Sequence, residues 1–151
     1  QEGREEEVIT RLSRVGYDQP LGYLKGGIAE WIKAAKETDT ITSVSADEFA
    51  VAYKKGNANI LDVRKASEYF SEHIVEAENA PLDYINDSML KVDKNKSYYV
   101  HCAGGYRSMT FVSILQARGY RNLINVAGGF SAIKATGKFR ISDYVCPTTM
   151  L

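Results

Sequence analysis

Short apolar runs alternate with longer helical patterns along most of the chain. Three runs of apolar and β-branched residues have the length and composition of buried strands. They are residues 59–63, 97–102 and 123–126. The stretch from Arg107 to Arg118 is apolar around much of its circumference and stops at Gly119, which predicts a well-buried helix. Because strands that alternate with helices form parallel sheets, we expect a small α/β domain with helices on both faces of a parallel sheet.

The start of this domain is marked by Ser45, which stands three residues before Glu48 as in a capping box. A helix that begins there is expected to end at Gly56, since glycine commonly closes helices. These signals divide the chain into three parts after its first segment. We expect a linker over residues 37–44, the domain over 45–140 and a tail over 141–151.

The first segment of the chain resembles the end of this domain. Residues 11–17 match residues 114–120 at an offset of 103. The stretch that begins with Gly26-Gly27 matches the one that begins with Gly128-Gly129 at an offset of 102. We interpret residues 1–36 as a partial α-β-α unit, the C-terminal remnant of an upstream repeat. The alternative is two unrelated helix–strand–helix units.

Charge and cysteine content narrow the functional classes. Nineteen basic residues balance nineteen acidic ones, so no net charge attracts nucleic acid or an anionic membrane. Two cysteines are too few for a disulfide scaffold, and no apolar run has the length of a membrane span or signal segment. We therefore expect a cytoplasmic location. The sequence opens at Gln1 and runs directly into a helical pattern, so we expect an upstream domain in the same polypeptide.

Cys102 is the candidate nucleophile, because it stands between a predicted strand and the buried helix. Gly104 and Gly105 allow loop conformations in which backbone N–H groups turn inward, and the helix start adds its own N–H groups. Such a loop favours an anion, so it would lower the pKa of the thiol and make it nucleophilic at pH 7. Arg107 can donate to the loop or to a bound oxyanion, and Ser108 can help to cap the helix.

Each of these roles has a structural alternative. Cys102 could be an inert buried residue, although the loop favours the nucleophile. Arg107 could simply pair with a carboxylate. His101 could act as a general base, but neighbouring strand residues point to opposite faces, so we expect it to face away from the thiol.

Three motifs, in this order, resemble the signatures of the rhodanese family. They are residues 61–69 with 72–74 and 77–81, residues 101–108, and residues 125–130. The resemblance implies a sulfurtransferase in which Cys102 accepts a sulfane sulfur, becomes a persulfide and passes that sulfur to a thiol or to cyanide. Thiosulfate and glutathione persulfide are the implied donors, with no metal or organic cofactor. The implied active-site loop consists of Ala103, Gly104, Gly105, Tyr106, Arg107 and Ser108.

Supporting roles are expected for other residues of these motifs. Asp62, Arg64 and His73 brace the scaffold in this interpretation, with Asp62 and Arg64 as a fixed ion pair at a strand end. The Gly128-Gly129 pair could form a second anion site, but close helix packing is favoured. Cys146 could resolve a persulfide on Cys102 as a disulfide, but an idle exposed thiol is favoured.

Three other interpretations compete with an independent sulfurtransferase. Cysteine phosphatases share the motif but have one more residue between cysteine and arginine than the four found here. A silent rhodanese-like module could bind a partner or sense oxidants without turnover. The layout also resembles tandem rhodanese domains behind a metallo-β-lactamase-like enzyme. With only His73 and His101 and no clustered ligands, we expect no metal site in this segment.

Ala103 bears on the choice of donor. The commoner rhodanese loop has an arginine at this position, and thiosulfate is a dianion that needs positive partners. Arg107 alone is expected to hold it poorly, whereas Tyr106 and the space beside Ala103 could admit an organic stem. We therefore expect a preference for organic persulfides over thiosulfate.

Overall fold

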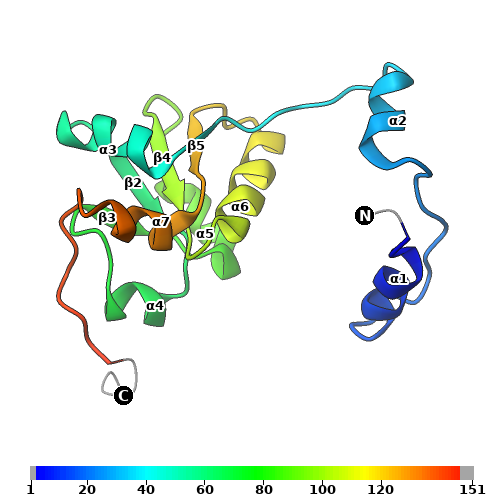
Figure 1. Ribbon diagram of the computed structural model, residues 1–151, viewed down its shortest axis with the longest axis horizontal. Helices are drawn as coiled ribbons and strands as arrows, with labels where there is room; N and C mark the ends of the chain where they lie inside the picture. Colours follow the sequence, from blue (N-terminus) through cyan, green and yellow to red (C-terminus); the bar gives the residue numbers. More distant parts are fainter. Residues whose placement is uncertain (1–2, 147–151) are drawn as a thin grey trace. The chain divides into compact units, whose positions relative to one another are not determined.

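The computed structural model describes residues 3–146, and the chain divides into two units after Thr40 (Figure 1). The first unit contains helices α1 (Glu5–Ser13) and α2 (Gly27–Lys33). Its described residues form no strand between them, so the expected α-β-α unit is a pair of helices here. A strand needs a neighbour for its backbone N–H and C=O groups, and the described part of this unit supplies none. Residues 1–2 and 147–151, the end of the expected tail, lie outside the described residues.

Within the described chain, the second unit is built on a five-stranded parallel sheet with the order β1-β5-β4-β2-β3. The strands are β1 (Ser43–Val44), β2 (Asn59–Asp62), β3 (Ala77–Asn79), β4 (Tyr98–His101) and β5 (Leu123–Val126). The three expected strands are β2, β4 and β5, each within one residue of its expected bounds. The expected fold class, a parallel α/β sheet with helices on both faces, is confirmed.

Two strands lie outside the expected set. β1 falls in the expected linker, yet it pairs with β5 through Ser43 opposite Asn125 and Val44 opposite Val126. The second unit therefore begins at Ile41, four residues before Ser45. Both β1 and β3 are too short for a hydrophobic period to mark them, since a strand signal needs several alternating or consecutive apolar residues.

Helices cover both faces of the sheet (Figure 1). They are α3 (Ala46–Lys54), α4 (Ala66–Ser71), α5 (Ile85–Ser88), α6 (Tyr106–Ala117) and α7 (Gly129–Thr136), with 3-10 turns η1 (Leu82–Tyr84) and η2 (Met89–Lys91). The expected capping box begins α3, where the Glu48 N–H donates to Ser45 Oγ at 3.2 Å and Glu48 Oε2 accepts from the Ser45 N–H at 2.7 Å. Such a cap stabilises a helix by about 1 kcal/mol.

The core has two layers, one on each face of the sheet. Leu61 and Val100 pack with Phe111 and Leu115 of α6, in a cluster that also contains Cys102. On the other face, the cluster consists mainly of residues from α3, α7 and the strands. It includes Phe49, Ile60, Val126, Phe130 and Ile133. Each such side chain contributes roughly 1.5–3 kcal/mol through burial, so the two layers hold the sheet rigidly beneath the end of β4.

None of the helices described between residues 3 and 146 has both the length and the apolar composition of a membrane-spanning segment.

Candidate active site

The loop after β4 curls around the sulfur of Cys102. Gly105 has a φ of +101°, in the left-handed region that L side chains rarely adopt. In this conformation its N–H donates to Cys102 Sγ at 3.1 Å. A Cβ at Gly105 would also lie only 3.2 Å from the backbone nitrogen of Gly128. Both the conformation and the close packing therefore require glycine.

Hydrogen bonds to the Cys102 sulfur favour its anionic form. The residue is buried, with 1% of its surface exposed, and burial raises the pKa of the thiol. The backbone N–H and hydroxyl of Ser108 and the N–H groups of Gly105 and Gly104 outweigh this effect, so the pKa of Cys102 lies below its ordinary value. The N-terminal end of α6 adds a favourable dipole. The loop is therefore an anion site with the thiolate as its occupant.

Ser108 has a different role from the expected cap. Gly105 is the N-cap of α6 and has no side-chain capping bond. Ser108 lies two residues into the helix and is fully buried, and its Oγ lies 3.6 Å from Cys102 Sγ. The same hydroxyl lies 3.1 Å from the Gly105 carbonyl oxygen. The side chain points toward the sulfur because its position in the first turn faces the loop.

The carbonyl side of the same loop is held by the start of α7. The Phe130 N–H donates to the Cys102 carbonyl oxygen at 2.6 Å, and the Ser131 N–H donates to that of Ala103 at 3.1 Å. A Cβ at Gly129 would collide with the Cys102 carbonyl oxygen. The two glycines thus serve close packing, as favoured from the sequence, and they also fix the loop. With its carbonyls bound to α7, the loop can present its N–H groups to the sulfur.

Arg107 pairs with Glu68 of α4. Its Nη1 and Nη2 donate to the two carboxylate oxygens at 2.6 and 2.8 Å. This hydrogen bonding lowers the pKa of Glu68 and raises that of Arg107. Arg107 therefore pairs with a carboxylate, which was the structural alternative to its binding an oxyanion. Sequence reasoning missed Glu68, although it lies inside the first motif, because separation along the chain gives no sign of which carboxylate reaches the loop.

A depression of about 410 Å³ lies beside the loop. Its lining comes from α4 and the residues beside it, from α7 and from the loop after β4, and consists of Arg64, Ser67, Glu68, Ser71, Glu72, Ala103, Phe130, Ser131 and Lys134. The two cations in this lining are both paired. Arg64 donates to Asp62 at 2.6 Å, and Lys134 donates to Glu72 at 2.6 Å. The depression therefore has cationic side chains but little surplus positive charge.

The expected ion pair between Asp62 and Arg64 is present and almost fully buried. Nε of Arg64 donates to both carboxylate oxygens at 2.9 Å, and Nη2 also donates to the Glu72 carbonyl oxygen at 2.7 Å. The guanidinium carbon lies 4.1 Å from the centre of the Phe130 ring. These contacts tie β2 to α4 and α7, the two helices that border the depression. The pair acts as a brace for the site.

His101 lies on the face of the sheet opposite the Cys102 side chain, as expected. Its ring stacks on Phe130 at 5.9 Å, and its Nε2 lies 3.9 Å from Asp62 Oδ2. Burial lowers the pKa of His101, only partly opposed by Asp62, so the ring is neutral at pH 7. A neutral, fully buried ring on that face is a structural residue.

The remaining candidates have scaffold or surface positions. His73 stacks on Tyr69 at 3.9 Å and its Nδ1 lies 2.8 Å from the Tyr69 carbonyl oxygen, which is a scaffold position. Gly104 and Tyr106 are exposed at the loop surface, Tyr106 by 90%. Cys146 is an exposed thiol in the C-terminal segment, next to Val145, whose backbone bonds to Ser71.

The family model of the rhodanese-like domain matches residues 45–136. The chain belongs to the rhodanese-like family. It is 32% identical over 82 residues to the thiosulfate sulfurtransferase GlpE of Coxiella burnetii, which covers 54% of this chain and 77% of that protein. It is 29% identical over 103 residues to the uncharacterized protein YqhL of Bacillus subtilis, covering 68% and 78%.

Solved structures agree with this assignment. A rhodanese-like domain protein from Staphylococcus aureus has 35% sequence identity and a TM-score of 0.58, over 62% of this chain and 91% of that one. The Rhodanese-like domain from an Anabaena protein has 24% identity and a TM-score of 0.62, over 74% and 85%. These matches show the rhodanese-like family, and the tandem layout with a metallo-β-lactamase-like enzyme stays a prediction.

Proposed function

We propose that this protein is a sulfurtransferase that carries sulfane sulfur as a persulfide on Cys102. The observation that supports it most directly is the set of hydrogen-bond donors around the sulfur, which lower the pKa of the thiol despite its burial. A structural cysteine has no need of such donors. The sulfurtransferase name of its relative GlpE points the same way. We place the reaction in the reducing cytoplasm, where the thiol stays available.

The reaction is a pair of thiol–disulfide-type exchanges. The Cys102 thiolate attacks the outer sulfur of a donor persulfide, an S–S bond to Sγ forms, and the donor's own S–S bond breaks to release a thiolate. The acceptor thiolate then attacks the outer sulfur on Cys102 and releases the Cys102 thiolate again. The loop N–H groups stabilise the negative charge on Sγ before the first step and after the second. No net oxidation or reduction occurs, so no cofactor takes part.

The donor that fits this site is an organic persulfide. Thiosulfate brings two negative charges, but Arg107 is paired with Glu68 and Ala103 adds no charge. Arg64 and Lys134 in the adjoining depression are likewise paired with carboxylates. An organic persulfide such as glutathione persulfide presents its outer sulfur on a slender stem. This shape suits a sulfur atom of a residue that is only 1% exposed.

Replacement of Cys102 by serine tests the reaction itself. The Cys102→Ser variant should fold normally, because oxygen and sulfur differ little in size, and should lose at least about a thousandfold in sulfur transfer, because serine is not ionised at neutral pH. Mass spectrometry after incubation with glutathione persulfide should show one added sulfur on the parent chain and none on the variant. A parent chain that takes up no sulfur would favour the silent module. Aryl phosphate turnover dependent on Cys102 would favour the phosphatase.

Donor choice is tested by restoring positive charge in two independent ways. Ala103→Arg adds a cation to the loop, and Glu68→Gln releases the charge of Arg107. Each should raise kcat/KM for thiosulfate at least about fivefold relative to glutathione persulfide, given Coulomb energies near a partly solvated loop. Lys65→Gln, at an exposed residue with an ion pair to Asp83, is the control. Equal or better use of thiosulfate by the parent chain would contradict this preference without affecting the proposed transfer.

A further inference from the structure

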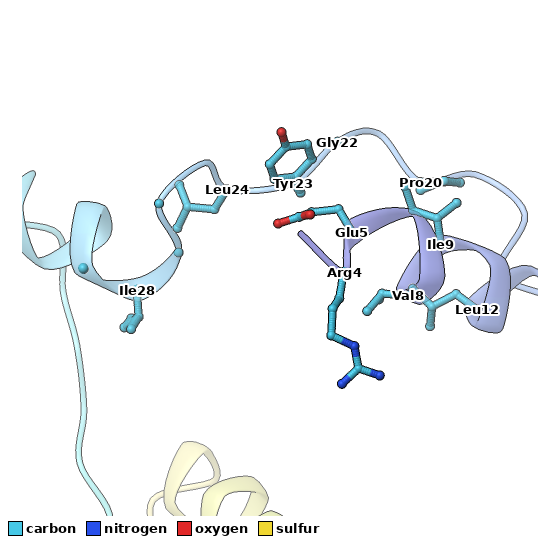
Figure 2. A pocket seen from close by; sticks show the side chains of 13 residues that line it. Arg4, Glu5, Val8, Ile9, Leu12, Pro20, Gly22, Tyr23, Leu24 and Ile28 are labelled. Atoms are coloured by element: carbon cyan, nitrogen blue, oxygen red, sulfur yellow. The ribbon is translucent and has the colours of Figure 1, made fainter. Parts of the chain in front are cut away.

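The first unit carries apolar side chains that it does not bury. None of its described residues is buried. On α1, Val8 is 50% exposed and Leu12 39%, and on α2, Ile28 is 66% exposed and Trp31 40%. Apolar side chains from α1, α2 and the intervening segment line a hollow of about 530 Å³, and Figure 2 shows Val8 and Leu12 on one face of α1. A helix pair with open apolar faces needs a partner surface.

The internal repeat identifies these open faces position by position. At the offset of 103, the three apolar residues of α1 correspond to the three buried apolar residues of α6. Val8, Ile9 and Leu12 correspond to Phe111, Val112 and Leu115, which are 0%, 1% and 0% exposed. At the offset of 102, Ile28 and Trp31 correspond to Phe130 and Ile133 of α7, which are 6% and 0% exposed. These five apolar residues of the first unit thus stand where the second unit contacts its sheet.

The backbone repeats as well. Gly26 and Gly27 have φ angles of +76° and +62°, and the matching Gly128 and Gly129 have +74° and +57°. Gly16, in the turn after α1, has a φ of +90°, and the matching Gly119 after α6 has +86°. These conformations are rare for other residues, so their agreement at three matched positions joins the sequence repeat to a structural one.

From this correspondence we infer that the first unit docks onto a second rhodanese-like sheet, supplied by the preceding segment of the same polypeptide. Residues 21–24 correspond to β5 and would add the strand that their own unit cannot form. In the second unit, β5 lies between β1 and β4, and both of these strands precede α6 along the chain. If the upstream repeat has the same order, the strands that flank residues 21–24 precede α1 along the chain and therefore lie before residue 1. Leu21 and Leu24, 102% and 51% exposed, would then fill the positions of Leu123 and Val126.

A second copy of this chain is a poorer occupant. Its sheet already has its own α6 and α7 over the equivalent positions, with Phe111 and Phe130 almost fully buried. The docking surface for α1 and α2 is therefore already covered in every copy. The occupant must be a sheet that lacks these helices.

Amide hydrogen exchange tests this inference by comparing the 151-residue chain with the natural polypeptide that contains the preceding segment. The amides of α1 and α2 should exchange at least about tenfold more slowly in the longer polypeptide. Leu12→Glu and Thr10→Glu are a matched pair, because both positions are exposed here but Leu12 corresponds to buried Leu115 and Thr10 to exposed Ser113. Leu12→Glu should abolish the added protection, and Thr10→Glu should leave it within about twofold.

Three results would overturn the inference. The first is equal exchange rates in the two polypeptides. The second is a natural polypeptide that lacks a preceding segment able to supply the strands equivalent to residues 43–101. The third is self-association of the 151-residue chain, seen by sedimentation and abolished by Leu12→Glu but not by Thr10→Glu, which would make a second copy the occupant.

Discussion

The two faces of the sheet stabilise charged groups in different ways. Adjacent residues contribute to both faces, because the side chains of His101 and Cys102 point to opposite sides. On the α6 face, the Cys102 sulfur accepts hydrogen bonds from the backbone and from Ser108, and no cationic side chain of residues 3–146 is among its hydrogen-bond donors. On the α7 face, Asp62 and Arg64 form a full ion pair. Backbone N–H dipoles stabilise the thiolate without neutralising its charge, so the sulfur stays reactive. In the ion pair each charge neutralises the other, so the pair has a structural role.

The loop backbone connects these two faces. Its N–H groups point to the sulfur, while its carbonyl groups accept from Phe130 and Ser131 at the start of α7. Phe130 in turn lies against Arg64 and His101. The fixed charges on one face therefore hold the helix that orients the amides on the other. Substitutions on the α7 face should therefore change mainly the stability of the fold, and substitutions on the α6 face mainly the reactivity of the thiol.

The largest expected effect is on stability, from the α7 face. Arg64→Met leaves the Asp62 carboxylate buried without its cation, which should lower the free energy of unfolding by about 3–5 kcal/mol. Urea unfolding followed by circular dichroism measures this loss. Arg140→Met, which breaks an exposed pair with Glu76, is the control and should cost less than about 1 kcal/mol.

If the single variant does not fold, the double variant Asp62→Asn with Arg64→Met provides a second test of the role of charge. It removes the uncompensated charge and should be more stable than Arg64→Met alone. If the double variant is no more stable than the single one, Arg64 acts through packing and not through charge.

The next effect is on reactivity, from the α6 face. Ser108→Ala removes the hydroxyl donor that favours the thiolate and keeps the backbone N–H, so the pKa of Cys102 should rise by up to about one unit and sulfur transfer at pH 7 should fall by up to about tenfold. Because the loss comes from protonation, the rate should recover as pH rises above the new pKa. A titration of the thiolate by ultraviolet absorbance measures the shift. Thr110→Ala, on the exposed side of the same helix, should change neither quantity.

The smallest expected effect concerns the exposed thiol outside both faces. Cys146→Ser should leave the rate of sulfur transfer within about twofold, because Cys146 lies in the C-terminal segment and contributes nothing to the donors around Cys102. Steady-state kinetics with glutathione persulfide decide this. A much larger loss, together with a Cys102–Cys146 disulfide in the parent chain, would assign Cys146 a resolving role.

Local patterns in the sequence predicted the features that depend on near neighbours along the chain. The runs at residues 59–63 and 123–126 became strands, and Ser45 capped its helix, because hydrophobic burial and capping act over a few residues. The glycines and the helix after Cys102 predicted an anion site for the same reason. The opposite orientation of His101 followed from the two-residue period of a strand.

Only the tertiary structure decided which distant groups meet. The sequence contained Glu68, Phe130 and Ser131, but it gave no sign that one pairs with Arg107 and that the other two bind the loop carbonyls. It also contained β1 inside an expected linker, because a two-residue strand exists only through its pairing with β5. Local propensities act within a helical turn or a strand. Charge partners and sheet edges are chosen by packing between elements far apart in the chain, which no local pattern encodes.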